Sequence, residues 1–281
     1  MHVQDITFGV EIECYVPVGR LRIGGYHNGL QVPELPAGWN AQRDGSLSTR
    51  SRGKVGCEVV SPVLRGSDGL RQIKQVVEFL HSIGATVNAR CGLHVHVGVG
   101  ADLDLVRKVT TLAANFETAI YASTGTDRRE RGGFCSPISA AYRGMSFADR
   151  RDMAIRSRYH LLNLTNFAHG TRPTVEFRAF AGTLNFGKIA AYVRLCVGLT
   201  ERAAKAKRAT DWTAKPVAPT SPIYRKAGAG QTALTRLFYQ LGWIKGRQPH
   251  THGDLTGDGL PTIAATKRTL KQLAAKYDAQ R

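Results

Sequence analysis

The sequence predicts an α+β protein in which a mostly antiparallel β-sheet is covered by helices. Segments with the two-residue alternation of apolar and polar side chains that is typical of β-strands occur at residues 6–16, 91–99 and 174–180. Segments with apolar residues at helical spacing occur at about 68–83, 103–121 and 188–208. These segments do not alternate regularly, as they would in a parallel α/β sheet, and this favours the α+β class.

The domain organisation follows from length and composition. The 281 residues, of which 42% are hydrophobic, are enough for one large domain with an appendage. We expect a main domain over residues 1–208 and a linker over 209–230, where Pro, Ala, Gly and Thr dominate. Residues 231–281 are then expected to form a basic helical extension, with helices near 231–243 and 262–278.

The chain is strongly basic. Its 39 Lys and Arg residues against 21 Asp and Glu give a formal net charge of +18, and much of the excess lies in residues 201–281. Such a charge favours polyanionic partners, among them nucleotides, nucleic acid and acidic peptides. A generally solvated basic surface would give the same composition.

Cysteine usage and hydropathy indicate the compartment. Five cysteines are scattered through apolar runs without a Cys-x-x-Cys pair, which is typical of reduced, buried thiols. No run approaches the roughly 18 apolar residues of a membrane span, and the first residues lack the basic-then-apolar pattern of a signal peptide. We therefore expect a cytoplasmic protein without a membrane span.

Two glutamates share one face of the first predicted strand. The alternation over residues 6–16 places Glu11 and Glu13 on the face opposite the apolar side chains. Carboxylates at i and i+2 lie about 7 Å apart along a strand and repel each other unless a cation compensates them. A solvated sheet edge would also tolerate them, but the flanking apolar residues favour a central strand with a metal-binding or catalytic role.

Other predicted strands also carry side chains that can bind metals or anions, and two of these strands place them at positions i and i+2. One strand places His94 and His96 on one face, and a later strand does so for Glu176 and Arg178. Glu58 interrupts a short apolar strand, where a buried carboxylate needs a partner. A His-x-His strand alone is a weak signal, and a Glu–Arg pair is often only a salt bridge.

Together these strands predict a metal-binding face. If they are neighbours in an antiparallel sheet, one face gathers four carboxylates, two imidazoles and a guanidinium group. Four like charges on one sheet face require compensation. Divalent cations supply it, and a mostly carboxylate donor set suits Mg²⁺ or Mn²⁺ better than a thiolate-rich or three-histidine zinc site would.

Two loops add candidate residues. Asp44, which precedes Gly45, is typical of a tight turn and is alternatively a substrate contact. The segment 122–158 is rich in Gly and Arg, and a loop of this length is usually a lid or a binding loop, or is disordered. Its arginines at positions 128, 129, 131 and 143 would suit a phosphate or carboxylate ligand.

Taken in order, these motifs resemble the amidoligase branch of the carboxylate–amine ligases, the superfamily that also holds glutamine synthetase and glutamate–cysteine ligase. The resemblance covers roughly residues 6–200 and rests on the motifs Gly9-x-Glu11-x-Glu13, Glu58-x-x-Ser61-Pro62, Gly92-Leu93-His94-x-His96, Arg131-Gly132-Gly133-Phe134-Cys135-Ser136-Pro137, Glu176-Phe177-Arg178 and Gly182-Thr183-Leu184-Asn185. Asn185 stands where an Asp is common in the family, and the basic C-terminal stretch matches no part of it.

The resemblance implies a fold, a reaction and a metal site. The fold would be a curved sheet forming a glutamine-synthetase-like catalytic funnel, with helices packed outside. ATP would phosphorylate a substrate carboxylate, and an amine would attack the acyl phosphate to give an amide, ADP and phosphate. Glu13 and Glu58 would hold one Mg²⁺ (or Mn²⁺), and Glu11, His94 and Glu176 would hold the metal that bridges the phosphates.

The remaining positions would contact the nucleotide or the amine. By similarity, His96 and Arg131 would lie near ATP, and Arg178 would neutralise the transferring γ-phosphoryl group. Metals plus arginine are the expected equipment, because phosphoryl transfer depends on positioning and charge neutralisation. Asp44 is a candidate base for the amine on position and chemistry alone. The arginine-rich loop suggests an acidic carboxylate donor, such as a glutamyl or aspartyl group, free or on a peptide.

Two other classes of protein would carry similar features. A metal-dependent hydrolase or nuclease acting on a phosphodiester would use His-x-His, carboxylates and a basic surface. A nucleic-acid-binding protein with a degenerate catalytic domain would bind through the basic C-terminal residues. This alternative is weakened because the predicted metal-ligand positions still carry side chains that can bind a metal. ATP turnover that depends on Mg²⁺, a carboxylate and an amine separates the ligase from both. Related ligases share active sites between subunits, so a homo-oligomer is a further expectation.

Overall fold

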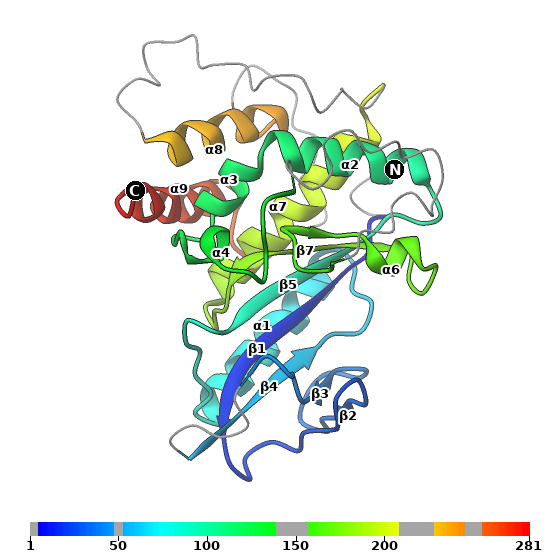
Figure 1. The fold of residues 1–281 in the computed structure, drawn as a ribbon. Helices are drawn as coiled ribbons and strands as arrows, with labels where there is room; N and C mark the ends of the chain where they lie inside the picture. The colour runs from blue at the N-terminus through cyan, green and yellow to red at the C-terminus, as the bar shows by residue number, and fades with distance from the viewer. Residues whose placement is uncertain (1–4, 48–52, 139–156, 208–227, 245–254) are drawn as a thin grey trace.

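A single antiparallel sheet with helices makes up the fold (Figure 1). The computed structural model describes residues 5–47, 53–138, 157–207, 228–244 and 255–281. The strands are β1 (Phe8–Pro17), β2 (Leu30–Gln31), β3 (Asn40–Gln42), β4 (Lys54–Val60), β5 (Gly92–Gly98), β6 (Leu162–Asn163) and β7 (Thr174–Ala181). They lie in the order β2-β3-β4-β1-β5-β7-β6, and every neighbouring pair is antiparallel. The predicted α+β class is confirmed, with an open sheet.

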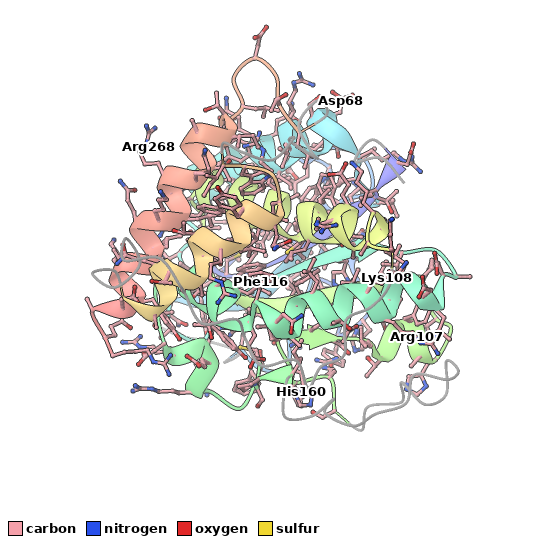
Figure 2. All side chains as sticks on the ribbon, turned by 90° about the horizontal axis from the view of Figure 1, so that it is seen from above. Asp68, Arg107, Lys108, Phe116, His160 and Arg268 are labelled. Carbon is pink, nitrogen blue, oxygen red and sulfur yellow. The ribbon has the colours of Figure 1, made fainter. Side chains whose placement is uncertain are left out.

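The long helices agree with the periodicity of the sequence. The helices are α1 (Gly66–Ser82), α2 (Leu103–Asn115), α3 (Glu117–Ala122), α4 (Arg128–Arg131), α6 (Thr165–Ala168), α7 (Phe186–Ala204), α8 (Ala229–Gln240) and α9 (Ile263–Asp278). The stretch expected as one helix over 103–121 is divided at Phe116, whose φ of −119° and ψ of 19° leave the helical range. Figure 2 shows Phe116 at this junction.

One face of the sheet packs against helices. Alternate residues of β1 and β5, among them Ile12 and Val95, are fully buried in the hydrophobic core. The side chain of Phe180 on β7 stacks on Tyr192 of α7 with ring centroids 4.3 Å apart. A Cβ atom at Gly69 of α1 would lie 2.7 Å from the Phe8 ring, so a glycine allows this helix to approach β1 closely. The polar residues of the central strands are therefore left on the other face.

The two C-terminal helices belong to the same core. Helix α9 packs against α3, α7 and α8, and Leu237 and Leu270 are buried in the core that the sheet shares. The Asp278 carboxylate caps the first turn of α8 by accepting from Gly230 N (2.7 Å) and Gln231 N (3.0 Å). Both predicted C-terminal helices are confirmed. The stretch expected as a linker lies mostly outside the described residues, and its last two positions already belong to α8.

Within the described residues, no helix is long and apolar enough to cross a membrane. The five cysteines are buried, and each is a free thiol. The closest approach that joins two of them is 3.8 Å between the sulfur atoms of Cys14 and Cys57, on the paired strands β1 and β4.

A buried arginine ties the C-terminal residues to the main helix. Arg194 of α7 is 1% exposed and donates to Thr266 Oγ1 (2.8 Å) and to the Leu255 carbonyl oxygen. Burial lowers its pKa to about 10, so the guanidinium is charged at neutral pH. It therefore holds a charge in the interior, and among the described residues Thr266 and Leu255 supply the hydrogen-bond acceptors that compensate it.

We predict that Arg194→Ala lowers the free energy of unfolding by about 3 kcal/mol, because it leaves a cavity and unpaired buried acceptors. Arg194→Met refills the volume and should lose less. Guanidinium unfolding followed by circular dichroism measures both variants. Equal and negligible losses would show that the C-terminal helices are held by apolar packing alone.

Candidate functional site

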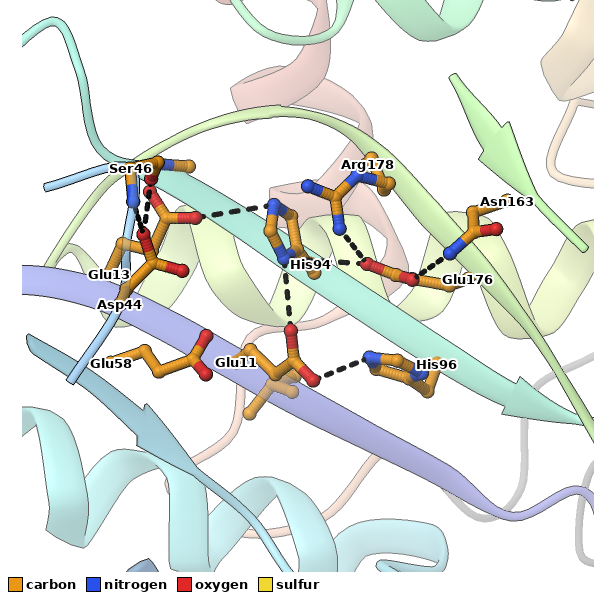
Figure 3. A network of polar contacts seen from close by, with 12 residues as sticks. Glu11, Glu13, Asp44, Ser46, Glu58, His94, His96, Asn163, Glu176 and Arg178 are labelled. Carbon is orange, nitrogen blue, oxygen red and sulfur yellow. Dashed lines mark hydrogen bonds and ion pairs between the residues drawn. The ribbon is translucent and has the colours of Figure 1, made fainter. Parts of the chain in front are cut away.

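The register of the central strands brings the predicted metal ligands and Arg178 together on the polar face of the sheet, opposite the hydrophobic core (Figure 3). Across neighbouring strands, Glu11 pairs with His94, Glu13 with Glu58, and His96 with Glu176. The expectation that these strands are neighbours is therefore confirmed. Paired residues in an antiparallel sheet share a face, so the polar side chains of neighbouring strands together form one polar patch.

His94 lies at the centre of this patch. Its Nδ1 atom is 3.0 Å from Glu11 Oε2 and 3.4 Å from Glu176 Oε1, and its Nε2 atom is 3.5 Å from Glu13 Oε1. The side chain is almost fully buried, as are those of Glu13 and Glu176. One imidazole thus stands between three carboxylates that would otherwise repel one another in a low-dielectric environment.

The imidazoles and Arg178 keep two of the carboxylates ionised. Burial alone would raise the pKa of Glu11, but His96, at 3.0 Å, and His94 hold it well below the usual range. Burial would likewise raise the pKa of Glu176, but His96, Arg178 and His94 lower it. Arg178 Nη1 donates to Glu176 Oε1 at 2.5 Å. Both groups are therefore available as anionic oxygen ligands.

Glu58 behaves differently from the other carboxylates. Burial and the charge of Glu11 raise its pKa to about 8, although a 2.5 Å hydrogen bond from Gln42 Nε2 opposes the shift. A carboxyl group with this pKa carries a proton at neutral pH. It must lose that proton before it can bind a cation.

A divalent cation fits the donor set of this face. One ligand atom each from Glu11, His96 and Glu176 lies within 4.8 Å of the others, which is close enough for all three to bind one ion. Two carboxylate oxygens and one imidazole suit Mg²⁺ or Mn²⁺. The resemblance assigned His94 to this ion and His96 to the nucleotide. The geometry adds His96 as a ligand candidate, because it is the histidine whose ligand atom clusters with those of Glu11 and Glu176.

A β-bulge in β7 separates Arg178, which faces the site, from Phe180, which belongs to the core. Leu93 pairs with Phe180 but Val95 pairs with Phe177, so Arg178 and Ala179 together oppose the single residue between the two partners. Strict alternation would have turned Phe180 toward the polar face. The extra residue returns Phe180 to the core while the Arg178 side chain points at Glu176, as Figure 3 shows.

Adjoining cavities open over this face. One of about 550 Å³ is lined by the carboxylates Glu11, Glu58 and Glu176 with both site histidines. A second of about 580 Å³ lies beside Glu13 and is lined by five arginines, namely Arg90, Arg128, Arg129, Arg158 and Arg178. The two cavities share the residues Tyr26, Asp44, His94, Arg158 and Arg178. A third of about 780 Å³ meets the first at Glu11, His96 and Arg172 and has apolar walls that include Val10, Val60 and Pro62.

Arg129 links the arginine-lined cavity to the carboxylates. Its Nη2 atom donates to the Arg178 carbonyl oxygen at 2.6 Å. A Cβ atom at Gly92 would lie 3.1 Å from both this guanidinium and His94 Nε2, so a glycine makes room for the two side chains. Among the described residues, the buried Nε atoms of Arg129, Arg158 and Arg178 have no hydrogen-bond partner. These donors remain for an anionic ligand.

The other sequence candidates lie as follows. Asp44 borders the first two cavities, but its carboxylate accepts from Ser46 N (2.6 Å) and from the Ser46 hydroxyl, as a turn residue does. Arg131 lines none of these cavities; it is largely exposed and pairs with Asp127 at 3.0 Å. Arg129, two residues earlier on α4, reaches the site because two steps along a helix turn the side chain by about 200°. Asn185 caps α7 by accepting from Lys188 N (3.0 Å).

Sequence reasoning missed several residues of the site. Asn163 Nδ2 donates to Glu176 Oε2 at 2.6 Å, and its place in a short apolar strand was the available signal. Gln42 was hidden in a three-residue strand. Arg90 and Arg158 lie in turns, where no periodicity points to them. Arg143 lies outside the described residues.

Residues 33–200, more than half of the chain, match the family model described as "Putative amidoligase enzyme". The chain belongs to this amidoligase family. The matched amidoligase segment includes Glu58, His94, His96 and Glu176. It excludes β1, which carries Glu11 and Glu13 in the middle of the sheet, and it excludes α8 and α9. Among curated proteins, none matches the sequence.

We predict that the two histidines differ in metal binding. His96→Ala should weaken Mn²⁺ binding at least tenfold, because it removes a ligand, whereas His94→Ala should weaken it less, because His94 competes for the same carboxylates. Titration followed by electron paramagnetic resonance measures the affinities, with the exposed His169→Ala as the matched control. A larger loss in His94→Ala would return the ligand role to His94.

We predict that cation binding releases a proton below pH 8. Glu58, with a pKa of about 8, must ionise to bind, so the affinity for Mg²⁺ should rise with pH and level off above 8. In the metal-free protein the same raised pKa destabilises the fold as the pH rises from about 4.5 to 8. Calorimetry in two buffers with different ionisation enthalpies counts the protons. Glu58→Gln should abolish the release; an unchanged release would exclude Glu58.

Proposed function

We propose that this amidoligase-family protein is an ATP-dependent carboxylate–amine ligase that forms an amide or peptide-like bond through an acyl phosphate. The observation that carries the proposal is the cluster of four carboxylates, two imidazoles and Arg178 on one sheet face, beside a cavity with five arginines. Clustered anionic ligands suit cations, and the arginines suit anionic substrates. A catalytic funnel of the glutamine synthetase type is part of the same proposal.

The carboxylates would hold two divalent cations, Mg²⁺ or Mn²⁺. Glu13 and Glu58, on the paired strands β1 and β4, would hold one, and Glu11 and Glu176 with a site histidine would hold the other. When bound, the cations would neutralise the negative charge of the triphosphate. The low pKa of Glu11 supports this role, because an ionised carboxylate needs no proton loss to become a ligand.

In the first step, a carboxylate oxygen of the donor attacks the γ-phosphorus of ATP. The bond from that phosphorus to the β–γ bridging oxygen breaks, which releases ADP and leaves an acyl phosphate. Arg178 would neutralise charge on the transferring group, since its Nε atom is buried without a partner among the described residues while Nη1 is held by Glu176.

In the second step, the amine nitrogen attacks the acyl carbon and phosphate leaves with its bonding electrons. The nitrogen gives up one proton, so a nearby base is needed. Asp44 is our candidate because it borders both the metal-lined and the arginine-lined cavities. A general base must come within hydrogen-bond distance of that nitrogen, and the contacts of Asp44 with Ser46 would orient its carboxylate.

The cavities suggest where the substrates bind. Arg90, Arg128 and Arg129 would bind the second anionic group of an acidic donor, such as a glutamyl or aspartyl group, free or on a peptide. The apolar cavity beside His96 and Arg172 would suit the base and phosphates of the nucleotide. Buried free thiols support a reducing, cytoplasmic setting.

The test uses hydroxylamine as a general amine, because it converts any acyl phosphate to a hydroxamate. Purified protein is incubated with Mg²⁺, ATP, hydroxylamine and single acidic donors: L-glutamate, L-aspartate, glutarate and γ-glutamyl peptides. We expect ADP and hydroxamate in equal amounts, and only when metal, ATP and donor are all present. Cleavage of nucleic acid with metal and no ATP would instead support a metal-dependent nuclease.

We predict that Glu176→Gln lowers the rate of ADP formation at least a hundredfold, because a neutral amide keeps the shape but loses the charge that binds the cation. The fold should be retained, as measured by circular dichroism and melting temperature. Glu78→Gln makes the same change on the exposed side of α1 and should leave the rate unchanged. Unaltered turnover in Glu176→Gln would contradict a role for Glu176 in metal binding.

A further inference from the structure

The end of helix α9 is hydrogen-bonded to the short helix α4. Tyr277 of α9 donates its hydroxyl to Glu130 Oε2 of α4 at 2.5 Å, and Arg281 Nη1 donates to that hydroxyl oxygen at 2.6 Å. Arg281 Nη1 also lies 3.5 Å from Glu130 Oε2. Tyr277 is fully buried, and burial together with the bond to Glu130 raises its pKa, so the phenol stays a donor.

The turn that precedes α4 rests on the same helix end. Gln280 accepts a hydrogen bond from Asp127 N (3.3 Å) and donates to the Gly125 carbonyl oxygen (3.2 Å). Gly125 has a φ of +75°, and a Cβ atom there would lie 2.7 Å from the Leu273 side chain of α9. Only a glycine fits this conformation and this close contact.

Helix α4 needs such support because it is a single turn. Four residues form too few hydrogen bonds to offset the entropy of ordering them, so an isolated turn of this length is unstable in water. Yet α4 carries Arg128 and Arg129, which both line the cavity beside Glu13. Toward the site, the Arg129 guanidinium donates a hydrogen bond to the Arg178 carbonyl oxygen. The carbonyl oxygen of Arg129 accepts a hydrogen bond from Cys135 Sγ (2.8 Å).

We propose that the end of α9 is a positioning element for the reaction: Tyr277, Gln280 and Arg281 fix α4 so that Arg128 and Arg129 can bind the anionic group of the donor. This inference rests on the proposed ligase function. Helix α9 lies outside the residues that the amidoligase family model matches. The C-terminal helices would thus set the affinity of this chain for its donor, while Tyr277, Gln280 and Arg281 themselves line none of the three cavities.

The test compares Tyr277→Phe and Glu130→Gln with Arg268→Ala, a control on the outward side of α9 (Figure 2). L-Glutamate serves as the donor probe and hydroxylamine as the amine. We expect Tyr277→Phe and Glu130→Gln each to raise the KM for glutamate at least fivefold, with kcat and the KM for ATP within twofold of wild type. Because the two groups act on each other, the double variant should match the single variants.

One further measurement keeps the inference separate from the proposed function. Phenylglyoxal modification of Arg128 and Arg129, followed by peptide mass spectrometry, should change in rate in both variants and not in the control. If wild-type protein forms no hydroxamate but these rates change, the ligase proposal fails and the positioning of α4 by α9 stands. Equal modification rates, or an unchanged KM for glutamate, would overturn the inference.

Discussion

The repulsion among four carboxylates on one sheet face is the constraint on which the rest of this site depends. Glu13, Glu58 and Glu176 are nearly buried, and Glu11 lies among them, so their charges interact in a low dielectric. Three features compensate these charges: His94 lies between carboxylates, Arg178 binds Glu176, and the raised pKa of Glu58 favours its neutral form. All three are partial. Added cations would complete the compensation, so the proposed metal binding and the proposed ligase function rest on the same electrostatics.

The sheet can carry such a face because its other side supplies the hydrophobic stabilisation. Helices α1 and α7 pack on one side, and each fully buried valine or isoleucine there contributes about 1.5–3 kcal/mol. Strand β1 lies outside the segment that matches the amidoligase family but stands between β4 and β5. Its two glutamates therefore complete a candidate site whose other candidate ligands, Glu58, His94, His96 and Glu176, lie within the matched segment.

The C-terminal helices α8 and α9 have a structural role that the basic composition of this part of the chain did not suggest. Arg194 joins α7 to Thr266, Asp278 caps α8, and Tyr277 reaches α4. These contacts connect the helices to the core and to the arginine-lined cavity. The charged side chains of α9 that point outward, such as Arg268, are left for solvent or a polyanion.

The side-chain period of a strand is local, so the alternation of each strand could be predicted without the structure. It was enough to predict that Glu11, Glu13, His94, His96 and Glu176 face away from the core. The long helices could also be predicted from the sequence. Which carboxylates meet which imidazoles could not be predicted in this way, since strand pairing joins residues far apart in the chain. The bulge at Arg178, the approach of Arg129 over Gly92, and the outward turn of Arg131 likewise depend on packing between distant segments, which no periodicity records.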